Sequence, residues 1–318
     1  GADKVRKRPA VIFGSDGLDG CAHSVFEIIS NSIDEARSGY GNKIIITRWN
    51  DGTIEVEDFG RGCPVDFNNA ENRYNWELVY CELYAGGKFS DDEYDFSLGL
   101  NGLGLCATQF ASEFMDVTVH RDGTEYTLHF EKGENIGGLQ KAPYSKKQTG
   151  TKTRWKPDID VFTEIHVPDE FFHETLRRQA VVNPNLLFIY RSQQEDGSFL
   201  ETEYIYENGI SDYVQEIAGE KAMTPVQFWT AERVGRDRED KPDYRVKLSV
   251  ALTFSNQINL LEYYHNSSFL EHGGSPDRAV RSAFLSQINA FLKNSGKLQK
   301  NESLPVSTMK FYRNHYLS

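Results

Sequence analysis

The sequence has little positive charge for its size. It carries 35 Lys and Arg residues against 47 Asp and Glu residues, which gives a formal net charge of -12 at pH 7. Because phosphate backbones attract basic surfaces, this balance argues against a protein whose whole surface holds nucleic acid. A local basic patch on an acidic protein remains compatible with it.

Long hydrophobic runs and clustered cysteines are also missing. No apolar stretch approaches the roughly 20 residues that span a bilayer, and no charged-then-apolar leader opens the chain. We therefore expect a soluble, cytoplasmic protein with no membrane partner. The cysteines form no CxxC pair and have no histidine at zinc-finger spacing, which predicts buried, unreacting thiols at Cys21, Cys63, Cys81 and Cys106.

The rest of the composition is that of a folded protein. A hydrophobic share of 39% and an aromatic share of 13% exclude a disordered chain. Because 318 residues exceed one average core, we expect two domains, residues 1–207 and 208–318.

Periodicity and turn residues predict mixed α and β structure. An apolar stripe at helical spacing predicts a helix over His23–Ser38, which Gly39 and Gly41 end. Strands are predicted over 43–49 and 53–57, joined as a hairpin across Asn50-Asp51-Gly52. Further strands are expected over 114–120, 124–130, 151–155 and 244–254, with helices over 105–111 and 276–293. The result is an α+β fold, with helices on one face of a largely antiparallel sheet.

The first predicted helix carries a polar face opposite its apolar stripe. Glu27, Asn31 and Asp34 or Glu35 recur at intervals of three or four residues and so share this face. Alone, such a pattern is most often a solvated helix surface.

Three glycine-rich elements follow the helix and give its polar face a context. Asp58-Phe59-Gly60-Arg61-Gly62 places a carboxylate before a sharp turn, and Gly86-Gly87-Lys88 sets a cation beside a flexible hinge. Gly99 to Gly104 precedes a helix and can present bare N–H groups to a phosphate. A dinucleotide fingerprint has similar spacing, but it should follow a strand near the start of a βαβ unit, and this one does not.

In this order, the motifs resemble those of the GHKL ATPase superfamily. FEIISNSIDEA, EDFGRGCP, YAGGKF, LGLNGLG and TGT are similar to the gyrase B and topoisomerase IV type, the ATPase subunits of bacterial type IIA DNA topoisomerases. The resemblance runs from about residue 5 to about residue 298 and includes EHGGSPDRAVRSAF. It implies a GHKL-type ATPase α/β sandwich over residues 1–207, followed by a smaller, partial transducer domain of the ribosomal S5 type over 208–318.

The resemblance also implies roles for single residues. Glu27 is expected to polarise the attacking water, as a catalytic base. Asn31 is expected to coordinate Mg²⁺ through its amide oxygen, and Asp58 to accept from the adenine amine. The remaining residues expected to bind ATP are Gly60, Arg61, Gly62, Pro64, Lys88, Gly99, Asn101, Gly102, Leu103, Gly104, Arg121 and Thr151. For Asp34 and Glu35 a structural role, such as pairing with Arg61, stays open.

At the level of the whole molecule, the resemblance implies an ATP-driven clamp. The chain is expected to form a homodimer on binding ATP and to act on DNA with a gyrase A-type cleavage subunit. Aminocoumarin-type inhibitors are expected to bind the pocket of Asp58 and Arg121. Arg278 and Arg281 either face a DNA-holding cavity or are solvated helix charges.

The sequence departs from the family in three places. Asn101 stands where the family usually has histidine, and Asp95 where it often has a phosphate-facing lysine. Residues 301–318 match no family continuation and supply no transducer lysine, so the chain is expected to be a fragment that does not cleave DNA.

Three rival functions share the nucleotide fold or its remnants. A heat-shock-type chaperone does not account for AGGKF, TGT and GGSPDRAVRSAF. A sensor histidine kinase would need a phosphoacceptor helix, and none of the eight histidines lies in one. A module that has lost hydrolysis is disfavoured because Glu27 and Asn31 are both present.

Overall fold

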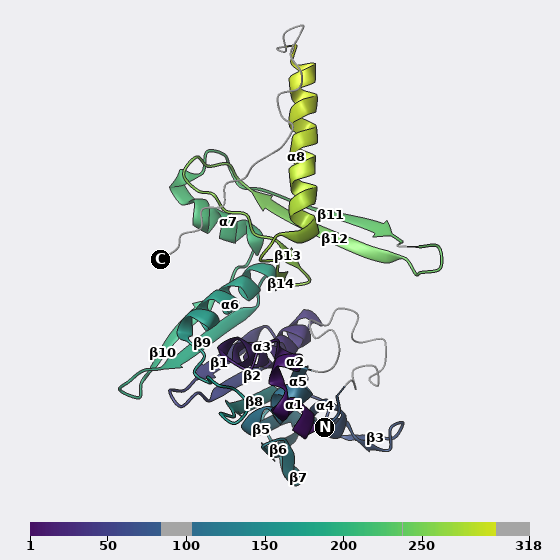
Figure 1. Ribbon diagram of the computed structural model, residues 1–318, viewed down its shortest axis with the longest axis vertical. Helices are drawn as coiled ribbons and strands as arrows, with labels where there is room; N and C mark the ends of the chain where they lie inside the picture. The colour runs from purple at the N-terminus through teal and green to yellow at the C-terminus, as the bar shows by residue number, and fades with distance from the viewer. Residues whose placement is uncertain (84–103, 237, 297–318) are drawn as a thin grey trace. The chain divides into compact units, whose positions relative to one another are not determined.

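The structure is a computed structural model that describes residues 1–83, 104–236 and 238–296 (Figure 1). The chain divides into two compact units, Gly1–Glu207 and Asn208–Ser318, and each is described by itself. Eight residues singled out in the sequence lie outside the described residues: Gly86, Gly87, Lys88, Asp95, Gly99, Asn101, Gly102 and Leu103.

A mixed sheet organises the first unit. Within the described residues it has eight strands in the order β10-β9-β1-β2-β8-β5-β6-β7. All neighbours are antiparallel except β1 and β9, which run parallel. The strands are β1 (Lys43–Arg48), β2 (Ile54–Asp58), β5 (Ser112–Arg121), β6 (Thr124–Glu131), β7 (Glu134–Pro143), β8 (Gly150–Pro157), β9 (Leu187–Gln193) and β10 (Phe199–Tyr204).

One face of this sheet forms the core. The register sets Ile46 beside Val56 and Val56 beside Thr153, and on the other side of β8 it sets Thr153 beside Val117. All four side chains are buried, because neighbouring strands present register partners on the same face. Asp58 and Thr151 continue this buried face toward the strand ends, so a carboxylate lies at the margin of an apolar core.

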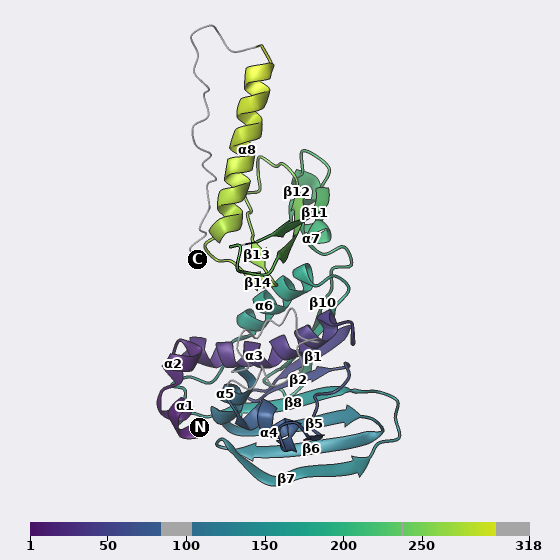
Figure 2. The ribbon, with the colours of Figure 1, turned by 90° about the vertical axis from the view of Figure 1, so that its right-hand side faces the viewer.

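Helices cover the core face, as Figure 2 shows for α3 and α5 above the sheet. The central helix α3 (Leu18–Arg37) contributes fully buried Val25, Ile29 and Ile33. Its opposite, polar edge carries the candidate site residues. The other helices of the unit are α1 (Ala2–Lys7), α2 (Pro9–Phe13), α4 (Asn75–Cys81), α5 (Gly104–Phe110) and α6 (Asp169–Val182), and a small hairpin joins β3 (Phe67–Asn68) to β4 (Arg73–Tyr74).

The second unit is smaller and more exposed. Strands β11 (Gln227–Gly235) and β12 (Tyr244–Leu252) pair antiparallel, as do the two-residue strands β13 (Tyr264–His265) and β14 (Ser268–Phe269). Helices α7 (Ile210–Ala218) and α8 (Gly274–Asn294) flank them in sequence, and η2 (Gly219–Lys221) follows α7. In the described part of this unit, α8 has no buried residue.

The predicted elements are confirmed with small shifts in their ends. The predicted helix over 23–38 begins five residues earlier, at Leu18, and the hairpin of β1 and β2 turns at Gly52 with φ 87°. Glycine adopts this positive φ without steric cost. The α+β architecture with helices on one sheet face is also confirmed. The elements that were not predicted are α1, α2, α4, α6, α7, η2, β3, β4, β7, β9, β10, β11, β13 and β14.

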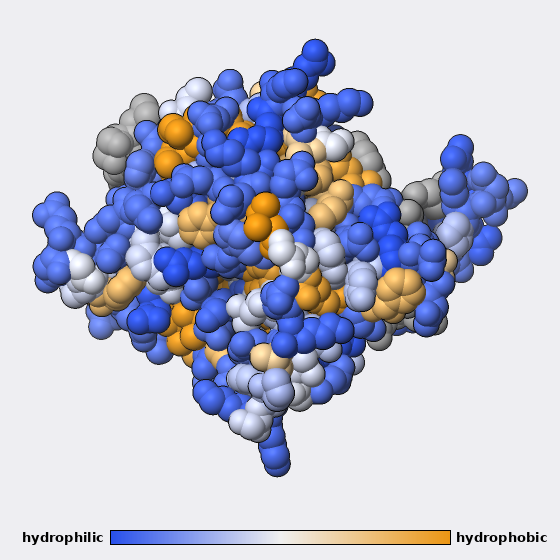
Figure 3. All heavy atoms as spheres, turned by 90° about the horizontal axis from the view of Figure 1, so that it is seen from below, coloured by the Kyte–Doolittle hydropathy of each residue, from blue (hydrophilic) through white to orange (hydrophobic). Residues whose placement is uncertain are grey.

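The molecular surface agrees with the acidic, polar composition. The face drawn in Figure 3 is mostly hydrophilic, with small hydrophobic spots separated by polar groups. Within the described residues, no helix is both long and apolar enough to cross a membrane. All four cysteines are free thiols, and burial raises the pKa of Cys21 and Cys63 to about 12.

Candidate nucleotide-binding site

The polar edge of α3 lies against the start of α5. The Glu27 carboxylate packs so closely on Gly104 that a methyl group there would lie 1.6 Å from Glu27 Oε2. Only glycine leaves room for this contact. One turn earlier, His23 Nε2 lies 3.1 Å from Glu27 Oε1, so the imidazole holds the carboxylate from its other side. The Glu27 side chain keeps 20% of its surface exposed and can therefore still meet a ligand or water.

Asn31 follows one turn after Glu27 on the same edge. Its amide nitrogen donates to the Glu27 backbone carbonyl over 2.6 Å. This bond turns the amide oxygen away from the helix backbone, and the residue is exposed. A single amide oxygen suits Mg²⁺, which keeps several waters and takes few protein ligands when phosphates supply the rest.

Asp58 ends β2 and is nearly buried, with 9% of its surface exposed. The backbone N–H groups of Gly60 and Thr151 donate to Oδ1 over 3.1 and 3.2 Å. The Ser32 hydroxyl donates to Oδ2 over 2.9 Å. These are the donors to Asp58 among the described residues, and a carboxylate has about four acceptor positions, so one position on Oδ2 stays open.

Burial raises the pKa of Asp58 to about 6, because it disfavours the charged form. The three hydrogen bonds act in the opposite direction, since each stabilises the carboxylate, and the charge of Glu35 raises the pKa further. Asp58 is therefore ionised at neutral pH, in a place where its charge is poorly solvated. An N–H donor on a bound ligand would therefore stabilise the Asp58 carboxylate.

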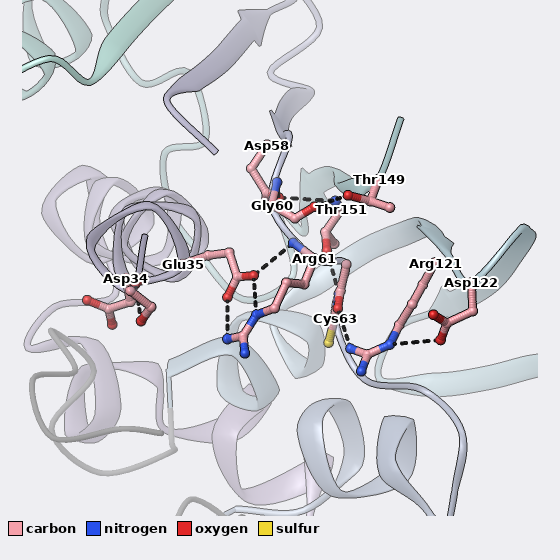
Figure 4. Close-up of polar contacts among 12 residues, drawn as sticks. Asp34, Glu35, Asp58, Gly60, Arg61, Cys63, Arg121, Asp122, Thr149 and Thr151 are labelled. Atoms are coloured by element: carbon pink, nitrogen blue, oxygen red, sulfur yellow. Dashed lines mark hydrogen bonds and ion pairs between the residues drawn. The ribbon is translucent and has the colours of Figure 1, made fainter. Parts of the chain in front are cut away.

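Glu35 and Arg61 form a fixed pair beside Asp58 (Figure 4). The Arg61 backbone N–H and Nε both donate to Glu35 Oε1, over 2.8 and 2.9 Å, and an Nη donates to Oε2 over 3.1 Å. The guanidinium also stacks on Tyr40, 3.8 Å from the ring centroid. Glu35, one of the two acids considered for this role, thus pairs with Arg61.

Gly60 makes this arrangement possible. A methyl group on Gly60 would lie 2.3 Å from Glu35 Cγ, so any larger residue would push the helix α3 side chain away. Gly150, across the sheet, has φ 147° and leaves no room for a methyl group against the Asp58 carbonyl, which would be 2.0 Å away. Both glycines bring backbone close to Asp58.

The loop after β2 is tied to β5 and β8. Arg121 donates to the Gly62 carbonyl over 2.9 Å, and the Cys63 N–H donates to Thr151 Oγ1 over 2.8 Å (Figure 4). Thr149 donates to the Gly60 carbonyl over 2.5 Å. Gly62 has φ 87°, and Pro64 continues the loop half-buried. These hydrogen bonds fix the position of the loop beside Asp58.

The structure therefore brings together one set of the predicted residues. Around α3, the loop after β2 and the start of β8 it gathers Glu27, Asn31, Asp58, Gly60, Arg61, Gly62, Pro64, Gly104, Arg121 and Thr151. In the second unit, Arg278 is exposed on α8, and Arg281 Nε donates to Asp277 Oδ2 over 2.7 Å.

Sequence reasoning missed three residues of this site: His23, Ser32 and Thr149. His23 precedes Glu27 by four residues, and this helical spacing could have indicated the pair. Ser32 and Thr149 gave no such signal, because their partners Asp58 and Gly60 lie 26 and 89 residues away in the chain.

Comparison with known proteins is consistent with this geometry. Residues 18–157 match the family of histidine kinase-, DNA gyrase B-, and HSP90-like ATPases, and residues 209–309 match the DNA gyrase B family. The second match extends to residue 309, so the expectation that the family pattern ends near residue 300 is wrong. Residues 297–309 of that match lie outside the described residues.

Relatives over nearly the whole chain are DNA gyrase B proteins. That of Thermotoga maritima is 32% identical over 95% of this chain and 47% of its own length, and that of Treponema denticola is 33% identical over 94% and 46%. The 43K ATPase domain of Thermus thermophilus gyrase B, solved in complex with an aminocoumarin, superposes with a TM-score of 0.71 at 25% identity, over 95% of this chain and 76% of that one.

By fold and by the matched family model, residues 18–157 are similar to the class of histidine kinase-, DNA gyrase B- and HSP90-like ATPases. Over almost its entire length the chain is similar, more narrowly, to DNA gyrase B proteins, with an ATPase sandwich followed by a transducer-type unit. It spans about half the length of these curated relatives.

Proposed function

We propose that the chain binds and hydrolyses ATP with Mg²⁺, and that this reaction drives the clamp of a gyrase B-like type II DNA topoisomerase. The observation that carries the proposal is the open acceptor position on the buried Asp58 carboxylate, which is bonded by Ser32 of α3, the same helix that carries Glu27. The similarity to gyrase B proteins supports it over a chaperone or a histidine kinase.

Adenine recognition follows from the chemistry of Asp58. An ionised carboxylate accepts hydrogen bonds only, so it suits the adenine amine. Guanine presents a carbonyl at the same position, so the open acceptor position of the buried carboxylate would face another acceptor without a donor, which is costly. The pocket for the base would be lined by Arg61, Pro64 and Arg121, together with Gly60, Gly62 and Thr151.

Hydrolysis is assigned to the α3 edge. Glu27, held by His23 and Gly104, would orient the attacking water and accept its proton. The Asn31 amide oxygen would hold Mg²⁺, which supplies charge neutralisation on the phosphates when it is bound. Gly104 begins α5. Of the residues outside the described part of the chain, we assign to the phosphates Gly99, Asn101, Gly102, Leu103 and Lys88.

In the intact enzyme, we propose that ATP closes two copies into a homodimer around DNA, and that a gyrase A-type protein cleaves the DNA. Such a protein would work in the cytoplasm. The aminocoumarin bound to the Thermus thermophilus relative suggests that this class of inhibitor competes for the same pocket, at Asp58 and Arg121.

Calorimetric titration tests the nucleotide site. We expect a non-hydrolysable ATP analogue with Mg²⁺ to bind the unmodified chain more tightly than the matching GTP analogue. Asp58→Asn should weaken ATP-analogue binding by about a hundredfold, because an amide N–H would replace the open acceptor and face the adenine amine.

Asp116→Asn is the matched control, because Asp116 lies on β5 with 47% of its side chain exposed and bonds His129 instead. It should bind as the unmodified chain does. If Asp58→Asn retained full affinity and adenine preference, the assignment of the base pocket would be wrong.

A further inference from the structure

Ser32 is a buried hydroxyl to which no role in the nucleotide site has been assigned. It lies on α3, with 6% of its surface exposed, on the side of the helix that faces the sheet. Its hydroxyl is the one side-chain donor to Asp58 among the described residues. Serines elsewhere on the same helix bond its own backbone: Ser24 donates to the Gly20 carbonyl and Ser30 to the Glu27 carbonyl.

The two oxygens of Asp58 are therefore held differently. In the described part of the chain, Oδ1 accepts from both backbone N–H groups, whereas Oδ2 accepts only from the Ser32 hydroxyl. The backbone donors fix one oxygen to the strand ends, and Ser32 fixes the rotation of the second oxygen, which carries the open acceptor position. The direction in which Asp58 offers that position to a ligand thus depends on Ser32.

Protonation would change Asp58 from a hydrogen-bond acceptor into a donor. An ionised Asp58 accepts from an amine, as in adenine, whereas a neutral Asp58 has an O–H that can donate to a carbonyl, as in guanine. A hydroxyl that donates to Oδ2 favours the ionised form, because it stabilises the charge.

From this geometry we infer that Ser32 is a positioning residue that keeps Asp58 an acceptor and thereby sets the preference for adenine over guanine. The inference deepens the proposed function and rests on it. Ser32 acts through Asp58 and need not touch the nucleotide.

The groups around Asp58 support the inference that Ser32 helps to keep its carboxylate ionised. Burial raises its pKa to about 6, and the charge of Glu35 on α3 adds to this rise. Arg61 offsets part of the Glu35 charge by pairing with it. Cys63 in the loop and Tyr80 on α4 also face this region, but burial raises both of their pKa values, so they stay neutral. The bond from Ser32 is one of the few contributions that keep Asp58 ionised near pH 7.

The test is Ser32→Ala, with Ser24→Ala as the matched control on the same helix. ATP-analogue and GTP-analogue affinities are measured by calorimetry at several pH values, and the Asp58 carboxyl is titrated by ¹³C NMR without nucleotide. We expect Ser32→Ala to bind the ATP analogue about twofold more weakly at pH 7, because about half of Asp58 would then be protonated, and to lower the adenine-to-guanine ratio about tenfold. The Asp58 midpoint should rise by about one pH unit, which corresponds to a tenfold change.

Ser32→Thr, which keeps a hydroxyl, should restore the midpoint and the ratio, and Ser24→Ala should change neither. If Ser32→Ala left both at their unmodified values, or lowered affinity for both nucleotides equally with an unchanged midpoint, Ser32 would have only a structural role and the inference would be overturned. If the unmodified chain bound no adenine nucleotide, the proposed function would fail first, and the NMR titration would show separately whether Ser32 controls Asp58.

Discussion

At the scale of single residues, Asp58 offers the acceptor proposed for adenine but lowers the stability of the unliganded fold at neutral pH. Its carboxylate lies at the margin of the apolar core, and its pKa is raised from 3.8 to about 6. Between these two values the folded chain binds more protons than the unfolded chain does. The free energy of unfolding therefore falls as pH rises through this window, and the group destabilises the unliganded fold above pH 6.

Asp58→Asn should accordingly stabilise the unliganded chain at pH 7.5, by about 1 to 3 kcal/mol. The amide oxygen can accept the two backbone N–H groups, and the amide nitrogen can donate to the Ser32 hydroxyl, so the geometry is kept. Urea denaturation at pH 7.5 and pH 4 measures the effect. The difference between variant and unmodified chain should shrink toward pH 4, and a destabilised variant at pH 7.5 would contradict this account.

Glu27 gives a second test at the same scale. Glu27→Gln keeps the size of the side chain and its contact with Gly104 but removes the base, so ATP hydrolysis should fall by roughly a hundredfold or more while ATP-analogue binding changes little. Steady-state phosphate release by the intact protein measures the loss. A variant with unchanged turnover would remove Glu27 from the mechanism.

At the scale of elements, a buried ion pair ties α1 to the rest of the first unit. Arg6 bonds Asp158, whose side chain is 3% exposed, and donates to the carbonyls of Phe110 and Ser112 over 3.0 and 3.2 Å. Burial acts to raise the pKa of Asp158, but Arg6, the Asp160 backbone N–H and the charge of Lys132 together outweigh it and hold the pKa below its usual value. The pair therefore connects the first helix to the end of α5, whose beginning contacts Glu27.

Arg6→Ala should destabilise the first unit by about 3 kcal/mol, because it leaves a buried carboxylate without its partner. For a unit of this size the melting temperature should fall by roughly 6 to 12 °C. Lys132→Ala, which removes a 57% exposed lysine from the same aspartate, is the control and should have little effect. The pKa of Asp158 is lower in the folded chain than in the unfolded chain, so the ionised carboxylate stabilises the fold at pH values above the unfolded pKa. The difference in stability caused by Arg6→Ala should therefore diminish as acid protonates Asp158.

The elements also show how far the sequence leads. The amphipathic stripe of α3 and the alternating strands β1, β2, β5, β6 and β8 were predictable, because their signals lie within a few neighbouring residues. β9 was not predicted, since it pairs parallel with β1 across more than 130 residues of chain. The glycine motifs indicated where backbone approaches Asp58, yet the hydrogen bonds from Ser32 and Thr149 join distant segments and require the fold.

At the scale of the whole molecule, the negative net charge opposes contact with the phosphate backbone of DNA. With a net charge of -12, association must rely on local basic groups, and the two arginines proposed for this purpose lie on α8. They differ in availability. Arg281 donates to Asp277, so its charge is partly compensated, whereas Arg278 is exposed one turn earlier on the helix.

This difference predicts a difference in salt dependence. If the clamp proposal holds, Arg278→Ala should reduce the slope of the logarithm of DNA affinity against the logarithm of salt concentration by about 0.9, the value for one lost phosphate contact. Arg281→Ala should change the slope by much less, because the arginine already has a carboxylate partner. Fluorescence anisotropy with a duplex of fixed length, in the presence of an ATP analogue and at several salt concentrations, measures both slopes. Equal slopes for Arg278→Ala and the unmodified chain would mean that Arg278 is a solvated helix charge and that DNA contacts lie on other elements.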